Sequence, residues 1–84
     1  MSKDEILKIL LSAAREIFDD EEVDFSFETP FSDVPDWDSL SNMHIVVRIE
    51  KVLGIVFEQT DFPVMTKIGE LVDVIVRKLD SPAG

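Results

Sequence analysis

Three stretches of the chain repeat apolar residues every three or four positions, which is the spacing of one face of an α-helix. They cover residues 3–18, residues 38/39–53 and residues 67–79. Polar residues occupy the other side of each stretch, so we expect three amphipathic helices that share one core. The core positions expected in the first helix are Ile6, Leu7, Leu10, Ala13, Ala14, Ile17 and Phe18. Those of the second are Leu40, Ile45, Val46, Ile49, Val52 and Leu53, and those of the third are Ile68, Leu71, Val72, Ile75, Val76 and Leu79.

Residues at the ends of the second and third stretches support these boundaries. Either Asp38 or Ser39 can cap the second helix, and Gly54 is placed to end it. Thr66 is expected to cap the third helix. Gly69, near the start of that helix, should cost about 1 kcal/mol relative to alanine.

Residues 19–37 form a long connection that contains Pro30 and Pro35. We expect it to be ordered, because its apolar side chains can pack across the helix ends. Trp37 in particular is expected to cover the core, in preference to contacting a bound group. Loops of this length in compact domains are often functional. The apolar residues of the loop are Val23, Phe25, Phe27, Phe31, Val34 and Trp37.

The remaining segments are short. Residues 55–57 (IVF) resemble a strand but have no pairing partner, so we expect them to be apolar plugs that leave the second helix. Residues 58–65 are turn-rich, with one short helical turn near Asp61–Val64, and residues 80–84 are expected to be a flexible tail. The predicted fold is an all-α bundle of three main helices plus one short helix, with a long ordered loop after the first helix. We expect a single domain over residues 1–84.

Composition argues against an enzyme and against a metal site. The chain has no cysteine and one histidine, His44, which excludes a disulfide or catalytic thiol and leaves little for a histidine-based site. No Gly-x-Ser-x-Gly motif surrounds Ser39, and His44 lies five positions further along the same predicted helix, where it points elsewhere. The acidic run at 19–22 (DDEE) lacks the ligand spacing of a calcium loop, so we interpret it as solvated charge.

Acidic residues outnumber basic residues 18 to 8, for a net charge of −10. This charge disfavours nucleic acid and anionic membranes as partners, and no apolar run approaches the ~20 residues of a membrane span. The first 18 residues interleave charged and apolar side chains, unlike a signal peptide, so we expect a cytoplasmic location. Ten acids and no Lys or Arg lie within residues 16–38. That segment should attract a basic patch on a partner protein.

Three segments together resemble the acyl carrier protein family: DWDSL at 36–40, MHIVVRIEKVLGIVF at 43–57 and TKIGELVDVIV at 66–76. The likeness covers nearly the whole chain. It implies that Ser39, flanked by Asp38 and Leu40, receives 4'-phosphopantetheine from coenzyme A through a phosphopantetheinyl transferase. The arm would carry an acyl thioester to acyl-loading and acyl-transferring enzymes of fatty-acid or polyketide type. The WDSL form is similar to carriers of specialised pathways more than to the carrier of bulk fatty-acid synthesis.

Position alone does not separate attachment at Ser39 from helix capping, and Ser41 could cap almost as well. Two other functions stay open at this point. One is an aminoacyl or peptidyl carrier, and the other is an unmodified acidic adaptor domain that binds proteins.

The resemblance also implies a partner-binding surface. Met43 and Val47 lie along one edge of the second helix next to Leu40, and acids flank the edge at Asp33, Asp36 and Asp61. One feature departs from the family, whose recognition helix is often rich in acids. Residues 39–54 hold one acid, Glu50, against Arg48 and Lys51, and with His44 these bases are expected to form a solvated face. We therefore expect dedicated partners and a monomeric carrier.

Overall fold

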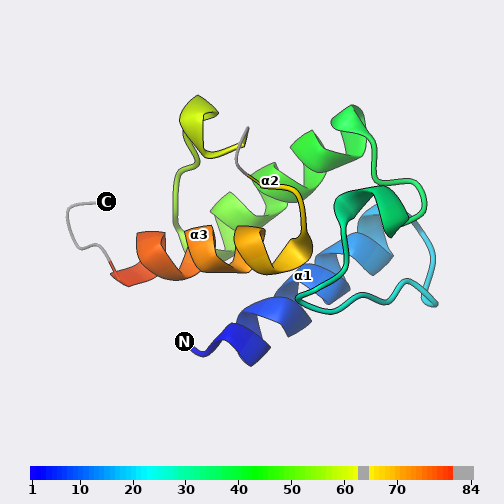
Figure 1. Cartoon of the computed structure of the whole chain (residues 1–84), viewed down its shortest axis with the longest axis horizontal. Helices are drawn as coiled ribbons and strands as arrows, with labels where there is room; N and C mark the ends of the chain where they lie inside the picture. Colours follow the sequence, from blue (N-terminus) through cyan, green and yellow to red (C-terminus); the bar gives the residue numbers. More distant parts are fainter. Residues whose placement is uncertain (63–64, 81–84) are drawn as a thin grey trace.

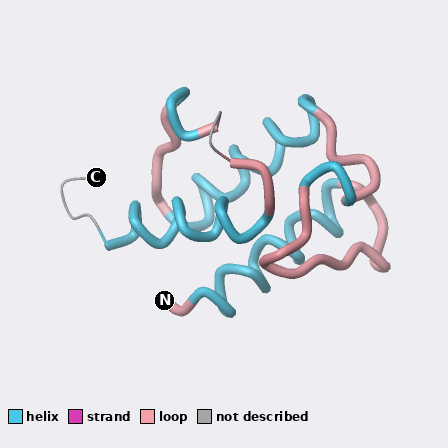
Figure 2. The backbone as a smooth tube through the Cα atoms, in the orientation of Figure 1, coloured by secondary structure: helices cyan, strands magenta, loops and turns pink. Residues whose placement is uncertain are grey.

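The computed structural model describes residues 1–62 and 65–80. Within them the chain is all-α, and helix α1 packs against both other helices (Figure 1). No strand occurs in these residues, and the single β-type contact is an isolated bridge between Pro30 and Lys67 (Figure 2). The predicted bundle of three main helices with a long ordered loop is confirmed. Its elements are α1 (Lys3–Ile17), the 3-10 turn η1 (Phe31–Asp33), α2 (Ser39–Leu53), the 3-10 turn η2 (Gln59–Asp61) and α3 (Ile68–Asp80).

Helix α2 buries a narrower face than the sequence predicted. Ile45, Val46 and Ile49 are buried, but Leu40 is 67% exposed and Val52 is 55% exposed. Leu40 lies five positions before Ile45, which turns it about 140° away at 3.6 residues per turn. Val52 lies at the rim of a hollow between α1 and α2. The prediction that these two residues belong to the core is therefore wrong.

Helix α3 follows its predicted stripe at four positions and departs from it at three. The prediction is confirmed for Ile68, Leu71, Val72 and Ile75, which are buried, and Val74 is buried as well although the pattern did not include it. The last two predicted positions, Val76 and Leu79, are only partly buried. Burial therefore fades toward the C-terminal end of the helix.

The loop between α1 and α2 is ordered and pinned to the bundle, as predicted. Val23, Phe25 and Val34 are buried in the core, while the other apolar side chains of the loop pack against it. The Arg15 side chain of α1 also donates a hydrogen bond from Nε to the Val23 carbonyl at 2.8 Å. Beyond the sequence prediction, the loop contains a helical turn of its own, η1.

The same loop closes the N-terminal end of α3. Backbone N–H groups in the first turn of a helix have no partner inside the helix. Here the Ile68 N–H donates to the Thr29 carbonyl at 2.9 Å, and the Gly69 N–H donates to the Phe27 carbonyl at 2.7 Å. In the reverse direction, the Phe31 N–H donates to the Thr66 carbonyl at 3.2 Å. These three bonds, which we call the loop–α3 clamp, tie residues 27–31 to residues 66–69.

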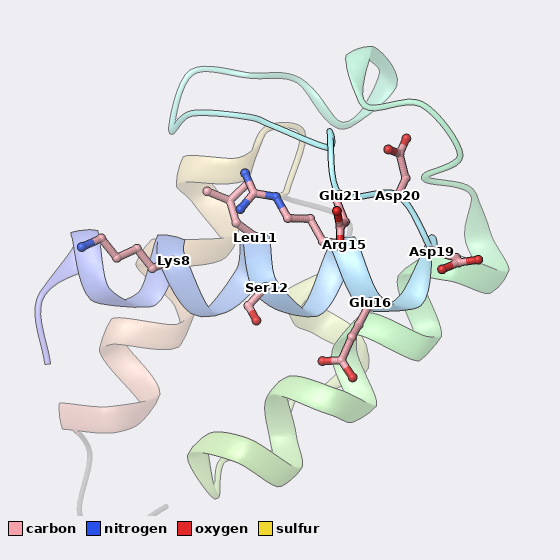
Figure 3. A pocket seen from close by; sticks show the side chains of 8 residues that line it. All are labelled: Lys8, Leu11, Ser12, Arg15, Glu16, Asp19, Asp20 and Glu21. Atoms are coloured by element: carbon pink, nitrogen blue, oxygen red, sulfur yellow. The ribbon is translucent and has the colours of Figure 1, made fainter.

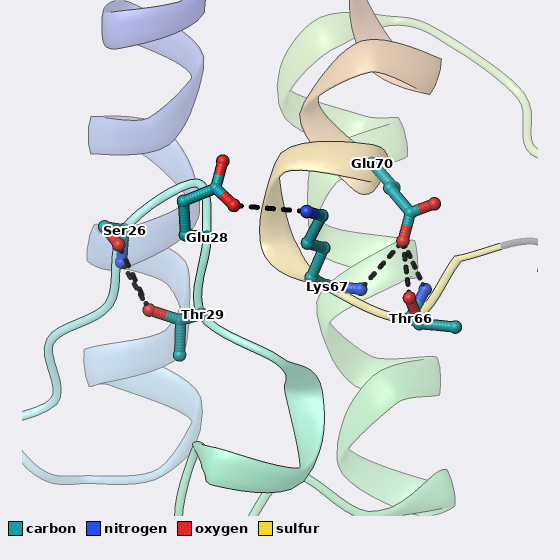
Figure 4. Close-up of polar contacts among 6 residues, drawn as sticks. All are labelled: Ser26, Glu28, Thr29, Thr66, Lys67 and Glu70. Carbon is teal, nitrogen blue, oxygen red and sulfur yellow. Dashed lines mark hydrogen bonds and ion pairs between the residues drawn. The ribbon is translucent and has the colours of Figure 1, made fainter.

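Thr66 does not cap α3 in the way the sequence predicted. Its hydroxyl donates to Glu70 Oε1 at 2.7 Å instead of accepting from the helix, and the same oxygen accepts the N–H groups of Thr66 and Lys67 (Figure 4). The Thr66 hydroxyl and N–H are the main reason that the pKa of Glu70 is lowered. The Lys67–Glu28 ion pair nearby, at 3.1 Å, is exposed and adds little. The Glu70 carboxylate thus fixes the backbone of residues 66–67, which lead into α3.

The segment after α2 combines one confirmed prediction with two corrections. Ile55 and Phe57 plug the core, but Val56 between them is exposed. The predicted helical turn near Asp61–Val64 is found earlier, as η2, and residues 63–64 lie outside the described residues. At the C-terminus, Asp80 is still helical, and residues 81–84 of the predicted tail also lie outside the described part.

The clamp makes a prediction about Gly69. A Cβ built at this position would lie 2.7 Å from the Phe27 carbonyl oxygen, so the loop backbone would have to move. Gly69→Ala should lower the free energy of unfolding by about 1–3 kcal/mol, as overpacking does. Helix propensity alone predicts a gain of about 1 kcal/mol. Urea unfolding of the two proteins measures the sign, and an alanine variant as stable as the parent would contradict the clamp.

Candidate functional site

Ser39 is the first residue of α2 and is exposed, while the residue before it does the capping. Asp38 Oδ1 accepts the Ser41 N–H at 2.8 Å, and the Asp38 carbonyl accepts the Asn42 N–H at 2.9 Å. No hydrogen bond within the described residues involves the Ser39 hydroxyl. Of the two possible caps, Asp38 is therefore the one used, and the serine oxygen is left accessible to another molecule.

A tight backbone turn delivers these residues to the start of the helix. Asp36 adopts a left-handed conformation with φ +69°, which aspartate tolerates better than most residues. Its carbonyl accepts the Asp38 N–H at 3.1 Å, and the Trp37 N–H donates to Val34 at 3.3 Å. The turn leaves Asp38 extended, as an N-cap residue must be.

Trp37 joins the loop to both α1 and α2. Its ring centroid lies 5.0 Å from that of Phe31 and 6.0 Å from those of Phe18 and Phe25. Its Nε1–H donates to Asn42 Oδ1 at 3.1 Å, so the polar edge of the indole is satisfied while the ring covers the core. The prediction that Trp37 covers the core is confirmed. The role of Asn42 could not be inferred, since an asparagine inside a helix gives no local signal for a distant indole.

A hollow of about 350 Å³ opens beside Ser39. Asp38, Ser39 and Asn42 supply its polar side chains, and aromatic and aliphatic side chains supply the rest. The start of α2 therefore combines an accessible hydroxyl with adjacent apolar space. The lining residues are Phe31, Trp37, Asp38, Ser39, Asn42, Phe62, Met65 and Leu71.

An apolar strip runs along α2 away from Ser39. Met43 and Val47, predicted to face a partner, are 59% and 44% exposed. With Leu40 they form what we call the α2 strip. Asp33 and Asp36, on the preceding loop, are exposed as well. These five residues are therefore accessible on α2 and the loop that leads into it.

Asp61, predicted to face a partner, has an internal role instead. Its Oδ2 lies 3.0 Å from Lys78 Nζ and accepts the Glu58 N–H at 2.7 Å, and its side chain is only 18% exposed. The Glu58 N–H and the Lys78 ammonium lower its pKa. The pair holds η2 against α3, so the expected partner contact of Asp61 is not supported.

Electrostatics at the start of α2 are set by Asp38. The backbone N–H of Ser41, with a further hydrogen bond from the Ser41 side chain, lowers the pKa of the carboxyl group. A carboxylate therefore already occupies the positive end of the helix dipole. A phosphate on Ser39 would lie beside that carboxylate, which would repel it.

A second hollow, of about 490 Å³, belongs to α1 and the turn that follows it (Figure 3). Lys8 and Arg15 line it together with Asp19, Asp20 and Glu21 of the predicted solvated run at 19–22, and Glu16 points toward α2. No cluster of His, Cys, Asp or Glu within the described residues is arranged to hold a metal ion. The hollow contains none of the residues around Ser39.

Within residues 1–62 and 65–80, no helix has the length and apolar character needed to cross a membrane.

Comparisons with known proteins decide the family. No protein-family model matches the chain, and no curated protein matches it. Among solved structures, the chain matches the solution NMR structure of holo acyl carrier protein from Geobacter metallireducens. The two are 33% identical, with a TM-score of 0.79, and the match covers 87% of this chain and 84% of that one. The chain belongs to the acyl carrier protein family.

Carriers of this family are not enzymes, and their cofactor is 4'-phosphopantetheine, held on a serine. The start of α2 in this acyl carrier protein fits such a group. Ser39 offers an exposed hydroxyl at the N-terminal end of a helix and beside a hollow, and it makes no hydrogen bond to residues 1–62 or 65–80. Asp38 and Leu40 flank it as in the Asp-Ser-Leu pattern, and Leu40 is exposed and free to contact another protein.

The Asp38 cap predicts a pH dependence of stability. Because folding lowers the pKa of this carboxyl, its contribution is complete above its ordinary value of about 4 and is lost as the pH falls through the folded value. Asp38→Asn retains a good cap but cannot titrate. The drop in unfolding free energy between pH 6 and pH 3 should therefore be smaller in Asp38→Asn than in the parent. Glu21→Gln, at an exposed acid outside the cap, is the control, and equal drops in all three proteins would disprove the effect.

Proposed function

We propose that Ser39 Oγ is the attachment point of 4'-phosphopantetheine and that the chain carries an acyl thioester between the enzymes of a specialised pathway. The observation that supports this most directly is that Asp38 caps α2, which frees the Ser39 hydroxyl. In the attachment step, Ser39 supplies the oxygen of the new phosphodiester. Its proton passes to a base on the transferase, and adenosine 3',5'-bisphosphate leaves from coenzyme A.

Once attached, the arm would supply the thiol that a chain without cysteine lacks, and an acyl group is held there as a thioester. The protein contributes a fixed anchor for the arm. Trp37 and Asn42 hold the first turns of α2 to the loop, so cargo would be presented from a defined point. A tethered group of this kind reaches successive active sites at high effective concentration.

Partner enzymes would recognise the carrier by the surface around Ser39. The α2 strip (Leu40, Met43 and Val47) offers apolar contact next to Ser39, and Asp33 and Asp36 offer charge on the loop. A phosphopantetheinyl transferase and the acyl-loading and acyl-transferring enzymes are the partners that this surface serves. The acids steer approach, while the strip contributes contact area.

The charge of α2 supports a specialised partner set. Glu50 is the one acid of this helix, and its carboxylate accepts the Phe57 N–H at 2.9 Å. Arg48 and Lys51 are the other charged residues of α2. A partner built to dock on an acid-rich helix would meet few carboxylates here. We further propose that the chain is a single-domain carrier that is monomeric and cytoplasmic.

Modification of Ser39 is tested by mass. After incubation with coenzyme A and a promiscuous phosphopantetheinyl transferase, the chain should gain the mass of one arm. Ser39→Ala should gain none, while Ser41→Ala should be modified like the parent. Absence of a gain with several transferases would favour the unmodified adaptor, and a gain in Ser39→Ala would place the site elsewhere.

Steering by the acidic loop is tested by salt. Asp36→Asn preserves the left-handed backbone, because asparagine tolerates it. It should slow modification about two- to fivefold at low salt. The difference should vanish near 1 M salt, where the Debye length is about 3 Å. Glu21→Gln changes the net charge equally at a distant position, so an equal slowing in both variants would exclude local steering.

A further inference from the structure

A hollow lined by basic side chains lies on α2 beside the end of α1, although the chain as a whole is strongly acidic. It has a volume of about 340 Å³ and is lined by Ile17, His44, Val47, Arg48 and Lys51. Two of the chain's eight Lys and Arg residues line it, although Asp and Glu number 18 in the whole chain. We call it the α2 basic hollow. His44 and Lys51 are exposed, in keeping with the solvated face expected of these bases, and Ile17 and Val47 add apolar surface to the same hollow.

The charges around this hollow are cancelled only in part within the chain. Arg48 Nη1 pairs with Glu16 Oε2 at 3.0 Å, which anchors the guanidinium at the edge between α1 and α2. Lys51 is exposed and has no ion-pair partner among the described residues. Glu50, the acid of α2, is engaged with the Phe57 N–H. Among the described residues, Lys51 is therefore the cation that supplies an unpaired positive charge next to the apolar surface of the hollow.

We propose that the α2 basic hollow receives an acidic side chain, flanked by apolar side chains, from a protein partner of the carrier. Charge complementarity selects a carboxylate for Lys51 and for the remaining donors of Arg48. The apolar flank fits because Val47 belongs to both the hollow and the α2 strip, so one bound segment covers both. The inference rests on the proposed carrier function and reverses the expected sign of the partner's charge along α2.

Two blocked amphipathic peptides test the sign of this preference. Both carry leucine along one helical face; the first has glutamate beside it, and the second has lysine at the same positions. The full ¹⁵N-labelled chain is titrated with each peptide at physiological ionic strength, where screening beyond about 8 Å suppresses the general attraction of the acidic chain for lysine. The glutamate peptide should bind at least about threefold more tightly than the lysine peptide, as expected for one partly exposed charge pair. It should shift the amide signals of Ile17, Val47 and Lys51.

A charge reversal locates the effect. Lys51→Glu should weaken the glutamate peptide about threefold or more and strengthen the lysine peptide. Lys8→Glu makes the same charge change on α1, outside the hollow, and should leave the preference unchanged. Equal or tighter binding of the lysine peptide to the parent, equal effects of the two substitutions, shifts confined to other residues, or no saturable binding would each overturn the proposal. The Ser39 mass assay on the same samples reports the carrier function separately.

Discussion

The clamp between the interhelical loop and α3 is the constraint from which the site follows. The carbonyls of Phe27 and Thr29 satisfy the first N–H groups of α3 at 2.7 and 2.9 Å, and buried or half-buried helix ends need such partners. Once residues 27–31 are fixed there, Phe31 is held where its ring meets Trp37. The position of Trp37 in turn sets the start of α2.

Two hydrogen bonds hold the backbone around Ser39 in place. The indole N–H holds Asn42 at 3.1 Å, and the Asp38 carboxylate holds the Ser41 N–H at 2.8 Å. Both bonds lie within the first turn of α2, so the backbone beneath Ser39 is fixed while its hydroxyl is not used. With the arm on Ser39, as proposed, this division would confine mobility to the arm, and the anchor would not add to the entropy lost at each docking event.

Local patterns predicted the helices, and through-space contacts account for what they missed. Apolar spacing located α1, α2 and α3 to within a residue or so, because each helix buries one face. The capping box at the start of α1 is likewise a local pattern, in which Ser2 is followed three positions later by Glu5. From the sequence, Gly69 only weakens the helix. The need for glycine there comes from the close approach of the Phe27 carbonyl, which lies 42 positions earlier in the chain. The choice between Asp38 and Ser39 as cap was open for a different reason: both residue types cap well, and only geometry separates them.

Charge is arranged along this carrier in two zones with separate effects. Asp33 and Asp36 lie on the loop before Ser39, while Lys51 lies more than three helical turns beyond it, which at 1.5 Å per residue is about 18 Å along α2. That separation is about twice the Debye length at physiological salt, so the two zones act on a partner independently. Under the proposed function, an enzyme that contacts only the surroundings of Ser39 would meet acids, whereas one that extends along α2 would meet apolar surface and bases. Such a carrier would accept a general modifying enzyme and still discriminate among the enzymes that use its cargo.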